Sequence, residues 1–309
     1  FLSFTSDYRV FFGSDDAHLQ AFEELQNTYT KNDNVLIVLS PEDGTIFTQK
    51  MLEAIADITE KAWQTPYSIR VDSITNFQHT SAQGDDLQVM ALFEDNPVLT
   101  DIQIRELKNI VLSEPILRNR LISNDAKVTA INITIELPGI NEATENPTVV
   151  ASIRDLRKYI EANYKGIKVY LSGIVMMNQA FNEASTNDTT KLIPLATLVI
   201  LIMVFLQLRG LTGTLCTFLV ILLSVASAMG AAGWLGIKLT APSMSAPTII
   251  LTLAVADCVH VLSNWVQKKN NEHLDNISAM NESIKINFHP VFLTSITTAI
   301  GFLSLNFSD

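Results

Sequence analysis

The chain has 309 residues, with 48% hydrophobic side chains, 17% charged side chains and a formal net charge of −11. It is longer than the usual ~100 to 200 residues of one domain, too apolar for an ordinary soluble protein and too charged for a protein buried wholly in lipid. DNA and RNA are excluded as main partners, because an acidic chain without clusters of Lys and Arg repels a phosphate backbone.

Charge is divided unevenly along the chain. Residues 1–190 hold 15 Lys or Arg and 27 Asp or Glu, a net charge of −12, whereas residues 191–309 hold 6 and 5, a net charge of +1. The first part is therefore acidic and soluble, and the second is nearly uncharged. Both cysteines, Cys216 and Cys258, lie in apolar stretches, which favours small hydrophobic side chains over a disulfide or a metal-binding pair.

Residues 1–174 have the pattern of an α+β domain. Two units show the order strand, helix, strand: Asn34–Ser40, Ile46–Trp63 and Tyr67–Ile74, then Lys127–Leu137, Glu145–Tyr164 and Ile167–Leu171. Short β-branched runs predict the strands, and apolar residues at helical spacing predict the helices. Two βαβ units of this size predict one split, ferredoxin-like domain, with a helical insertion at about 97–123 that could instead be a mobile flap.

Residues 175–190 predict a helix that leads directly into the first apolar run. Met176, Met177 and Phe181 recur at helical spacing, and no break signal follows them. A flexible linker would hold more Gly, Pro or Ser. We expect this coupling helix to join the soluble domain to the membrane domain.

Residues 191–309 form the predicted membrane domain. A spanning helix needs ~20 mainly apolar residues, and four runs are long enough or nearly so. Buried helices of a soluble core would show a polar face, but these runs are apolar all round. The sequence predicts a helical bundle with spans near 190–208, 211–234, 243–266 and 289–307.

Basic residues predict the orientation. Arg209, Lys268, Lys269 and Lys285 lie in links that would face the cytoplasm, where Lys and Arg accumulate. We therefore expect a multi-pass protein of the plasma (inner) membrane, with residues 1–190 on the extracytoplasmic, or periplasmic, side. The chain begins with neither Met nor a signal peptide, so we expect a fragment that lacks a preceding membrane helix.

Enzyme signatures are absent from the sequence. It contains no GxxxxGK[ST] loop, GxSxG elbow or HExxH motif, and its histidines lack the spacing of metal ligands. We expect no enzymatic activity, no metal and no cofactor.

Asp257 and His260 are the candidate functional residues, because both lie in the third apolar run, one helical turn apart. A carboxylate inside a bilayer costs at least ~2.5 kcal/mol, and such residues usually mark an ion or proton path. The pair predicts a proton relay, although polar pairs also hold helices together. Thr294, Thr297 and Thr298, together with Ser295, are candidates for lining the same path, although such hydroxyls often bond to their own helix.

This arrangement resembles the resistance-nodulation-division (RND) superfamily, in particular MMPL-type exporters and sterol-sensing-domain proteins. The likeness is strongest in LTLAVADCVHVL (251–262) and HPVFLTSITTAIGFLSLNFSD (289–309), and PYSIRVDSITNFQHT (66–80) is similar to the porter region. The resemblance implies that the four spans are the second to fifth helices of one half of a twelve-helix transporter. It also implies that Asp257 is the proton-carrying acid and that its charge partner lies in the other half.

Two functions follow from these expectations. The first is a proton-driven exporter of hydrophobic or amphiphilic molecules or lipids, with the proton as coupling ion. The second is a lipid- or sterol-responsive receptor or scaffold without transport. The expected partners are membrane lipid, the substrate, the second half of the same protein and further copies of the chain.

Overall fold

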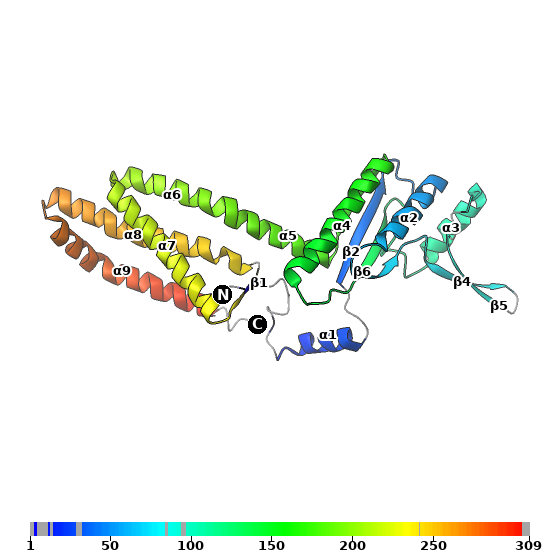
Figure 1. Ribbon diagram of the computed structural model, residues 1–309, viewed down its shortest axis with the longest axis horizontal. Helices are drawn as coiled ribbons and strands as arrows, with labels where there is room; N and C mark the ends of the chain where they lie inside the picture. The colour runs from blue at the N-terminus through cyan, green and yellow to red at the C-terminus, as the bar shows by residue number, and fades with distance from the viewer. Residues whose placement is uncertain are drawn as a thin grey trace. The chain divides into compact units, whose positions relative to one another are not determined.

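The computed structural model describes residues 3–4, 12, 15–28, 33–83, 86–93, 97–240 and 242–304. The chain divides into two compact units (Figure 1). Ser6–Asn182 form the first, called the α/β unit below. Phe1–Thr5 and Glu183–Asp309 form the second, called the helical unit.

The α/β unit is built on a four-stranded antiparallel sheet in the order β3-β6-β2-β7. Its strands are β2 (Asp33–Pro41), β3 (Ser68–Asp72), β6 (Thr129–Ile135) and β7 (Ile167–Ser172). Helix α2 (Gln49–Ala62) connects β2 to β3, and α4 (Glu142–Asn163) connects β6 to β7. The strands of each βαβ unit are separated by one strand of the other unit, so the predicted ferredoxin-like fold is confirmed.

The core of this unit lies between the sheet and the helices α2 and α4, which cover one of its faces (Figure 1). Alternate residues of β2, Val35, Ile37 and Leu39, are fully buried, as the two-residue period of a strand requires. Helix α2 begins where the Thr48 hydroxyl accepts the N–H of Met51 at 3.2 Å. Its apolar stripe, including Leu52 and Ile55, fills the space above the strands.

The segment 97–123 is only partly helical. Helix α3 (Asp101–Ser113) begins at a capping box formed by Thr100 and Gln103, and turns follow it to residue 122. A hairpin precedes it, β4 (Gln78–Gln83) with β5 (Asp86–Ala91), which the sequence pattern did not predict. Strand β4 reads QHTSAQ, so it lacks the apolar alternation by which a strand is recognised. A further helix, α1 (Ala17–Thr28), precedes β2.

Among the described residues, four helical runs are long and apolar enough to cross a membrane; the first begins in the α/β unit, and the other three lie in the helical unit. They comprise α5 (Ile174–Asn187), the π-helical turn η2 (Asp188–Leu192) and α6 (Ile193–Leu208) as one run, then α7 (Leu211–Trp234), α8 (Ala246–Asn271) and α9 (Asn276–Ser304). A 3-10 turn, η3 (Pro242–Ser245), leads into α8, and the short strands β1 (Ser3–Phe4) and β8 (Lys238–Leu239) pair in parallel. Together with the α/β unit, these helices confirm the predicted fold class.

Two helices extend beyond the predicted spans. Helix α8 ends at Asn271 rather than near 266, and α9 begins at Asn276 rather than near 289, so most of the link between them is helical. The Asp275 carboxylate accepts the N–H of Ile277 at 3.2 Å and so starts α9. Polar residues of this link, such as Ser283 and Asn287, fit a helix. They interrupt the run of apolar residues, however, so the apolar pattern did not predict this part of α9. The last residues of the predicted fourth span, 305–307, lie outside the described residues.

Candidate functional site

The candidate site lies between α8 and α9, which pack along each other. Pro247 lies in the first turn of α8, where proline fits a helix, and Lys268 and Lys269 lie in its last turn. Between these ends the helix is mainly apolar, with Asp257 near its middle. Asp257 therefore lies near the centre of a helix that is long and apolar enough to cross a membrane.

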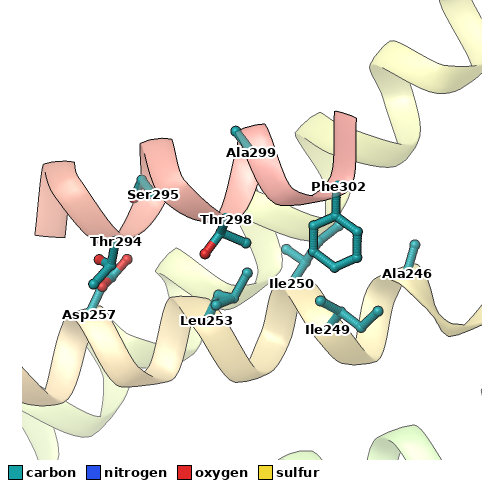
Figure 2. Close-up of a pocket in the computed structure, with 10 residues that line it drawn as sticks. All are labelled: Ala246, Ile249, Ile250, Leu253, Asp257, Thr294, Ser295, Thr298, Ala299 and Phe302. Atoms are coloured by element: carbon teal, nitrogen blue, oxygen red, sulfur yellow. The ribbon is translucent and has the colours of Figure 1, made fainter. Parts of the chain in front are cut away.

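A cavity of about 400 Å³ opens between the two helices (Figure 2). Most of its wall is apolar, and Asp257 is the single ionisable residue among those that line it: Ala246, Ile249, Ile250, Leu253, Asp257, Thr294, Ser295, Thr298, Ala299 and Phe302. Asp257 and Thr294 lie together at one end, whereas Ala246 and Phe302 lie toward the other (Figure 2). The cavity is thus an apolar pocket with one acidic, hydroxyl-bearing end.

The hydroxyl residues of α9 are arranged in two ways. Thr294 and Thr298 line the cavity, and Thr294 lies at the same end as Asp257 (Figure 2). The Thr294 hydroxyl also bonds to its own helix, donating to the carbonyl oxygens of Pro290 at 3.0 Å and Val291 at 2.9 Å. Thr297 is not among the lining residues, and its hydroxyl donates to the carbonyls of Leu293 and Thr294 at 2.8 and 3.0 Å.

His260 lies one helical turn after Asp257 on α8. It is exposed in this chain and is not among the residues that line the cavity. The structure therefore brings Asp257 together with Thr294, Ser295 and Thr298, while His260 remains beside it along the helix. The relay role of the Asp257 and His260 pair stays a prediction.

A buried polar network joins α8 and α9 beyond Asp257, toward the α8–α9 link. The Asn264 side-chain amide donates to Asn287 Oδ1 at 3.0 Å, and Asn287 Nδ2 donates to the Ser283 carbonyl oxygen at 2.8 Å. Ser283 Oγ donates to the Val261 carbonyl oxygen at 2.6 Å. Ser283 is fully buried and Asn287 is 6% exposed. The sequence reasoning missed these residues, although Asn264 lies seven residues after Asp257, and thus on the same helix face.

No group of three or more His, Cys, Asp or Glu side chains within the described ranges is arranged to hold a metal ion. The two thiols also stay unpaired in the part of the chain that the structure covers, with Cys216 exposed and Cys258 partly buried.

An α/β unit of ferredoxin-like topology and four apolar helices with an intramembrane carboxylate define a multi-pass membrane protein. The MMPL family matches residues 13–309, which is nearly the whole chain. The chain belongs to the MMPL family, and the predicted resemblance is confirmed.

Comparison with solved structures finds similarity to a heavy metal efflux pump determined by X-ray crystallography. The two share 13% sequence identity with a TM-score of 0.42, over 91% of this chain and 32% of that chain. The present chain thus spans about a third of the pump's length. No curated protein matches this chain.

Proposed function

We propose that the protein to which this chain belongs is a proton-motive-force-driven exporter of hydrophobic or amphiphilic molecules or lipids, and that Asp257 carries the proton. The observation that carries the proposal is the position of Asp257, as the lone ionisable group among the described residues that line an apolar cavity between two membrane helices. A carboxylate at this depth is costly enough that a purely structural role would be served better by a neutral side chain.

The surroundings of Asp257 suit a group that changes its protonation state. An apolar wall favours the neutral acid, whereas nearby hydroxyls and an approaching cation favour the carboxylate. Thr294 and Thr298 supply hydroxyls on the facing helix, and His260 supplies a second titratable group on the same helix. We propose that Asp257 and His260 form the relay, that Thr294, Thr297 and Thr298 lie along its path, and that the remaining partner belongs to the other half of the protein.

The α/β unit and the helical run after it suggest how proton transfer acts on substrate. We propose that residues 1–174 form the porter domain that collects substrate outside the cytoplasm, and that the helix over 175–190 couples it to the membrane domain, residues 191–309. Val175, in the first turn of α5, is buried in the α/β core, and the helical run continues to Leu208. We propose that movement passes between the two units along this helical run.

The decisive experiment measures pH-gradient-driven efflux of a hydrophobic dye or lipid from vesicles containing the full-length protein. Asp257→Asn should insert normally, because a neutral isostere is cheaper in lipid than a carboxylate, and yet lose gradient-driven transport. His260→Ala should weaken transport or shift its pH dependence without abolishing it. Thr252→Val is the matched control on α8, because Thr252 is not among the residues that line the cavity and its hydroxyl donates to the Thr248 carbonyl oxygen at 2.8 Å.

The same experiment distinguishes the exporter from the alternative function, a lipid- or sterol-responsive receptor. The apolar wall of the cavity favours it, since a lipid chain fits such a surface without any proton transfer. A receptor would keep ligand binding and signalling in Asp257→Asn and would show no efflux in the wild type. Wild-type efflux rates in Asp257→Asn would remove the acid from the mechanism.

Orientation in the plasma membrane can be tested on the same protein. We propose that the α/β unit lies outside the cytoplasm and the α8–α9 link inside. In a background without Cys216 and Cys258, a cysteine replacing Val98, which is 90% exposed, should react with an impermeant reagent from outside only. A cysteine replacing the exposed Asn270 should react from inside only. Labelling of both positions from one side would exclude this topology.

A further inference from the structure

The polar network between α8 and α9 lies one to two helical turns from Asp257, at the acidic end of the cavity. Asp257, Val261 and Asn264 are spaced by four and three residues, which places them on one face of α8. On α9, Thr294 and Asn287 are seven residues apart and Ser283 is four residues further, so they also share one face. Seven residues of helix span about 10 Å, so the network begins within two turns of Asp257.

We propose that Asn264, Asn287 and Ser283 are positioning residues: they clamp α8 to α9 in one register and thereby hold Asp257 against the hydroxyl wall of the cavity. The clamp contacts the turn of α8 that follows Asp257. Ser283 Oγ donates to the carbonyl of Val261, the residue one turn after Asp257. The proposal rests on the proposed role of Asp257 in proton transfer.

The chemistry of the clamp fits a site where a proton must move nearby. Its members are two amides and a hydroxyl, so the clamp stays intact whichever protonation state Asp257 adopts. Asn287 uses its amide N–H₂ and its carbonyl oxygen at once, toward Ser283 and Asn264 respectively. Because Asn287 and Ser283 are buried, either group left without its partner would bear the full cost of desolvation, and this favours a single register.

A change in the register between α8 and α9 would alter the distances from Asp257 to some of its neighbours and not to others. On α8 the titratable neighbours are His260 and Cys258, and α7 adds Cys216 near Cys258. Helix α9 contributes the hydroxyl residues Thr294, Ser295 and Thr298 to the cavity wall. A slip of α9 along α8 would move these hydroxyls relative to the carboxylate, whereas the α8 neighbours would keep their distance. The clamp should therefore tune the pH dependence of transport through the α9 hydroxyls.

The test uses the full-length protein in vesicles and measures transport as a function of pH for Asn287→Leu and Asn264→Leu. Leucine is inexpensive in lipid, so both variants should insert. We expect the pH of half-maximal transport to shift by roughly half a unit, the scale of one interhelical hydrogen bond. The double variant should shift no further than the larger single shift, because the two amides act as one unit.

Two further variants separate positioning from general structural damage. Asn287→Gln keeps an amide and should return the pH profile toward wild type even if protein yield is reduced. Gln207→Ala removes another interhelical contact, the 3.4 Å bond from Gln207 to Ser263 between α6 and α8, and should leave the profile unchanged. Unchanged profiles in Asn287→Leu and Asn264→Leu, or an equal shift in Gln207→Ala, would overturn the clamp.

Failure of this inference is distinguishable from failure of the proposed function. If Asp257→Asn transports normally, the proton role falls, and the positioning role built on it falls as well. If Asp257→Asn is inactive and Asn287→Leu keeps the wild-type profile, the proton role stands and the clamp alone is wrong. The clamp is supported only when Asp257→Asn is inactive and both leucine variants shift the profile.

Discussion

The two units of this chain bury their apolar residues in opposite ways. In the α/β unit, large side chains such as Ile37, Ile133 and Ile153 are fully buried between sheet and helices. In the helical unit, side chains such as Leu206 and Leu223 are about 60% exposed, and the cluster around Val204, Leu208 and Leu262 is small. Water drives the first arrangement, whereas lipid, or another protein surface, can cover apolar side chains that point outward in the second.

The polar contacts of the two units also differ in the kind of group that forms them. The α/β unit uses ionised carboxylates: Asp57 accepts hydrogen bonds from two tyrosines, and Glu145 accepts three backbone N–H groups. Helices α8 and α9 are joined by neutral amides and hydroxyls instead. The stability of the α/β unit should therefore depend on pH, whereas the α8–α9 contact should not.

The largest expected effect tests the difference in packing. Ile133 lies opposite both Val35 and Val71 in the sheet and is fully buried, so Ile133→Ala should lower the unfolding free energy of the α/β unit by about 2–5 kcal/mol. Leu223→Ala, the control in α7, should leave this unit unchanged. Urea unfolding of the purified chain, followed by Trp63 fluorescence after Trp234 and Trp265 are replaced by Phe, measures both. Similar losses in the two variants would contradict the comparison.

The next effect concerns glycine in the two units. Gly173 has φ +106°, and a Cβ there would lie 2.4 Å from the Asn34 carbonyl oxygen. Gly173→Ala should therefore cost at least about 1–3 kcal/mol in the same unfolding experiment. A Cβ added at Gly230 in α7 would meet no heavy atom of the described residues within 4 Å, so Gly230→Ala is the control and should insert normally. If Gly173→Ala were as stable as the wild type, the backbone between β7 and α5 would have to relax easily around the added methyl group.

A smaller effect is expected at the Asp57 cluster. Tyr164 O–H donates to Asp57 Oδ2 at 2.8 Å, and Tyr164→Phe should cost about 1–2 kcal/mol at neutral pH. Burial, with the Asp57 carboxylate, raises the pKa of Tyr164, so its contribution is complete below about pH 10 and is lost above it. Unfolding from pH 8 to 11 should therefore show a steeper alkaline loss in the wild type than in Tyr164→Phe. Tyr170→Phe, at a side chain that is 57% exposed, should behave like the wild type.

The smallest effect is expected at the start of α4. The backbone N–H groups of Asn141, Gly139 and Ile140 lower the pKa of Glu145, so its contribution is present above the ordinary value of 4.5 and is lost as the pH falls below it. Glu145→Gln can still accept hydrogen bonds, so the loss at pH 7 should be modest and the acid-induced loss should become shallower. Glu161→Gln, at an exposed i,i+4 pair with Arg157, is the control. If Glu145→Gln and the wild type lost stability identically as the pH falls, protonation of Glu145 would be excluded as a cause of that loss.

The sequence predicts the division into two units, the order of the strands and helices along the chain, and the place of Asp257 within an apolar run. These features follow from periodicity and length, because a strand repeats every two residues, a helix every 3.6, and a membrane requires ~20 apolar residues. The β4–β5 hairpin was missed because β4 reads QHTSAQ and lacks apolar alternation, and the early start of α9 was missed because polar residues such as Ser283 and Asn287 interrupt the apolar run.

Tertiary packing sets which residues share a cavity with Asp257. From the sequence, Thr294, Ser295, Thr297 and Thr298 are equal candidates for lining the path beside Asp257, since spacing places residues on a face but not against a neighbour. The packing of α9 on α8 places Thr294, Ser295 and Thr298 on the wall of the cavity that holds Asp257, leaves Thr297 outside that wall, and closes the Asn264, Asn287 and Ser283 network. That choice depends on the register between two helices, and register is set by contacts that no single helix contains.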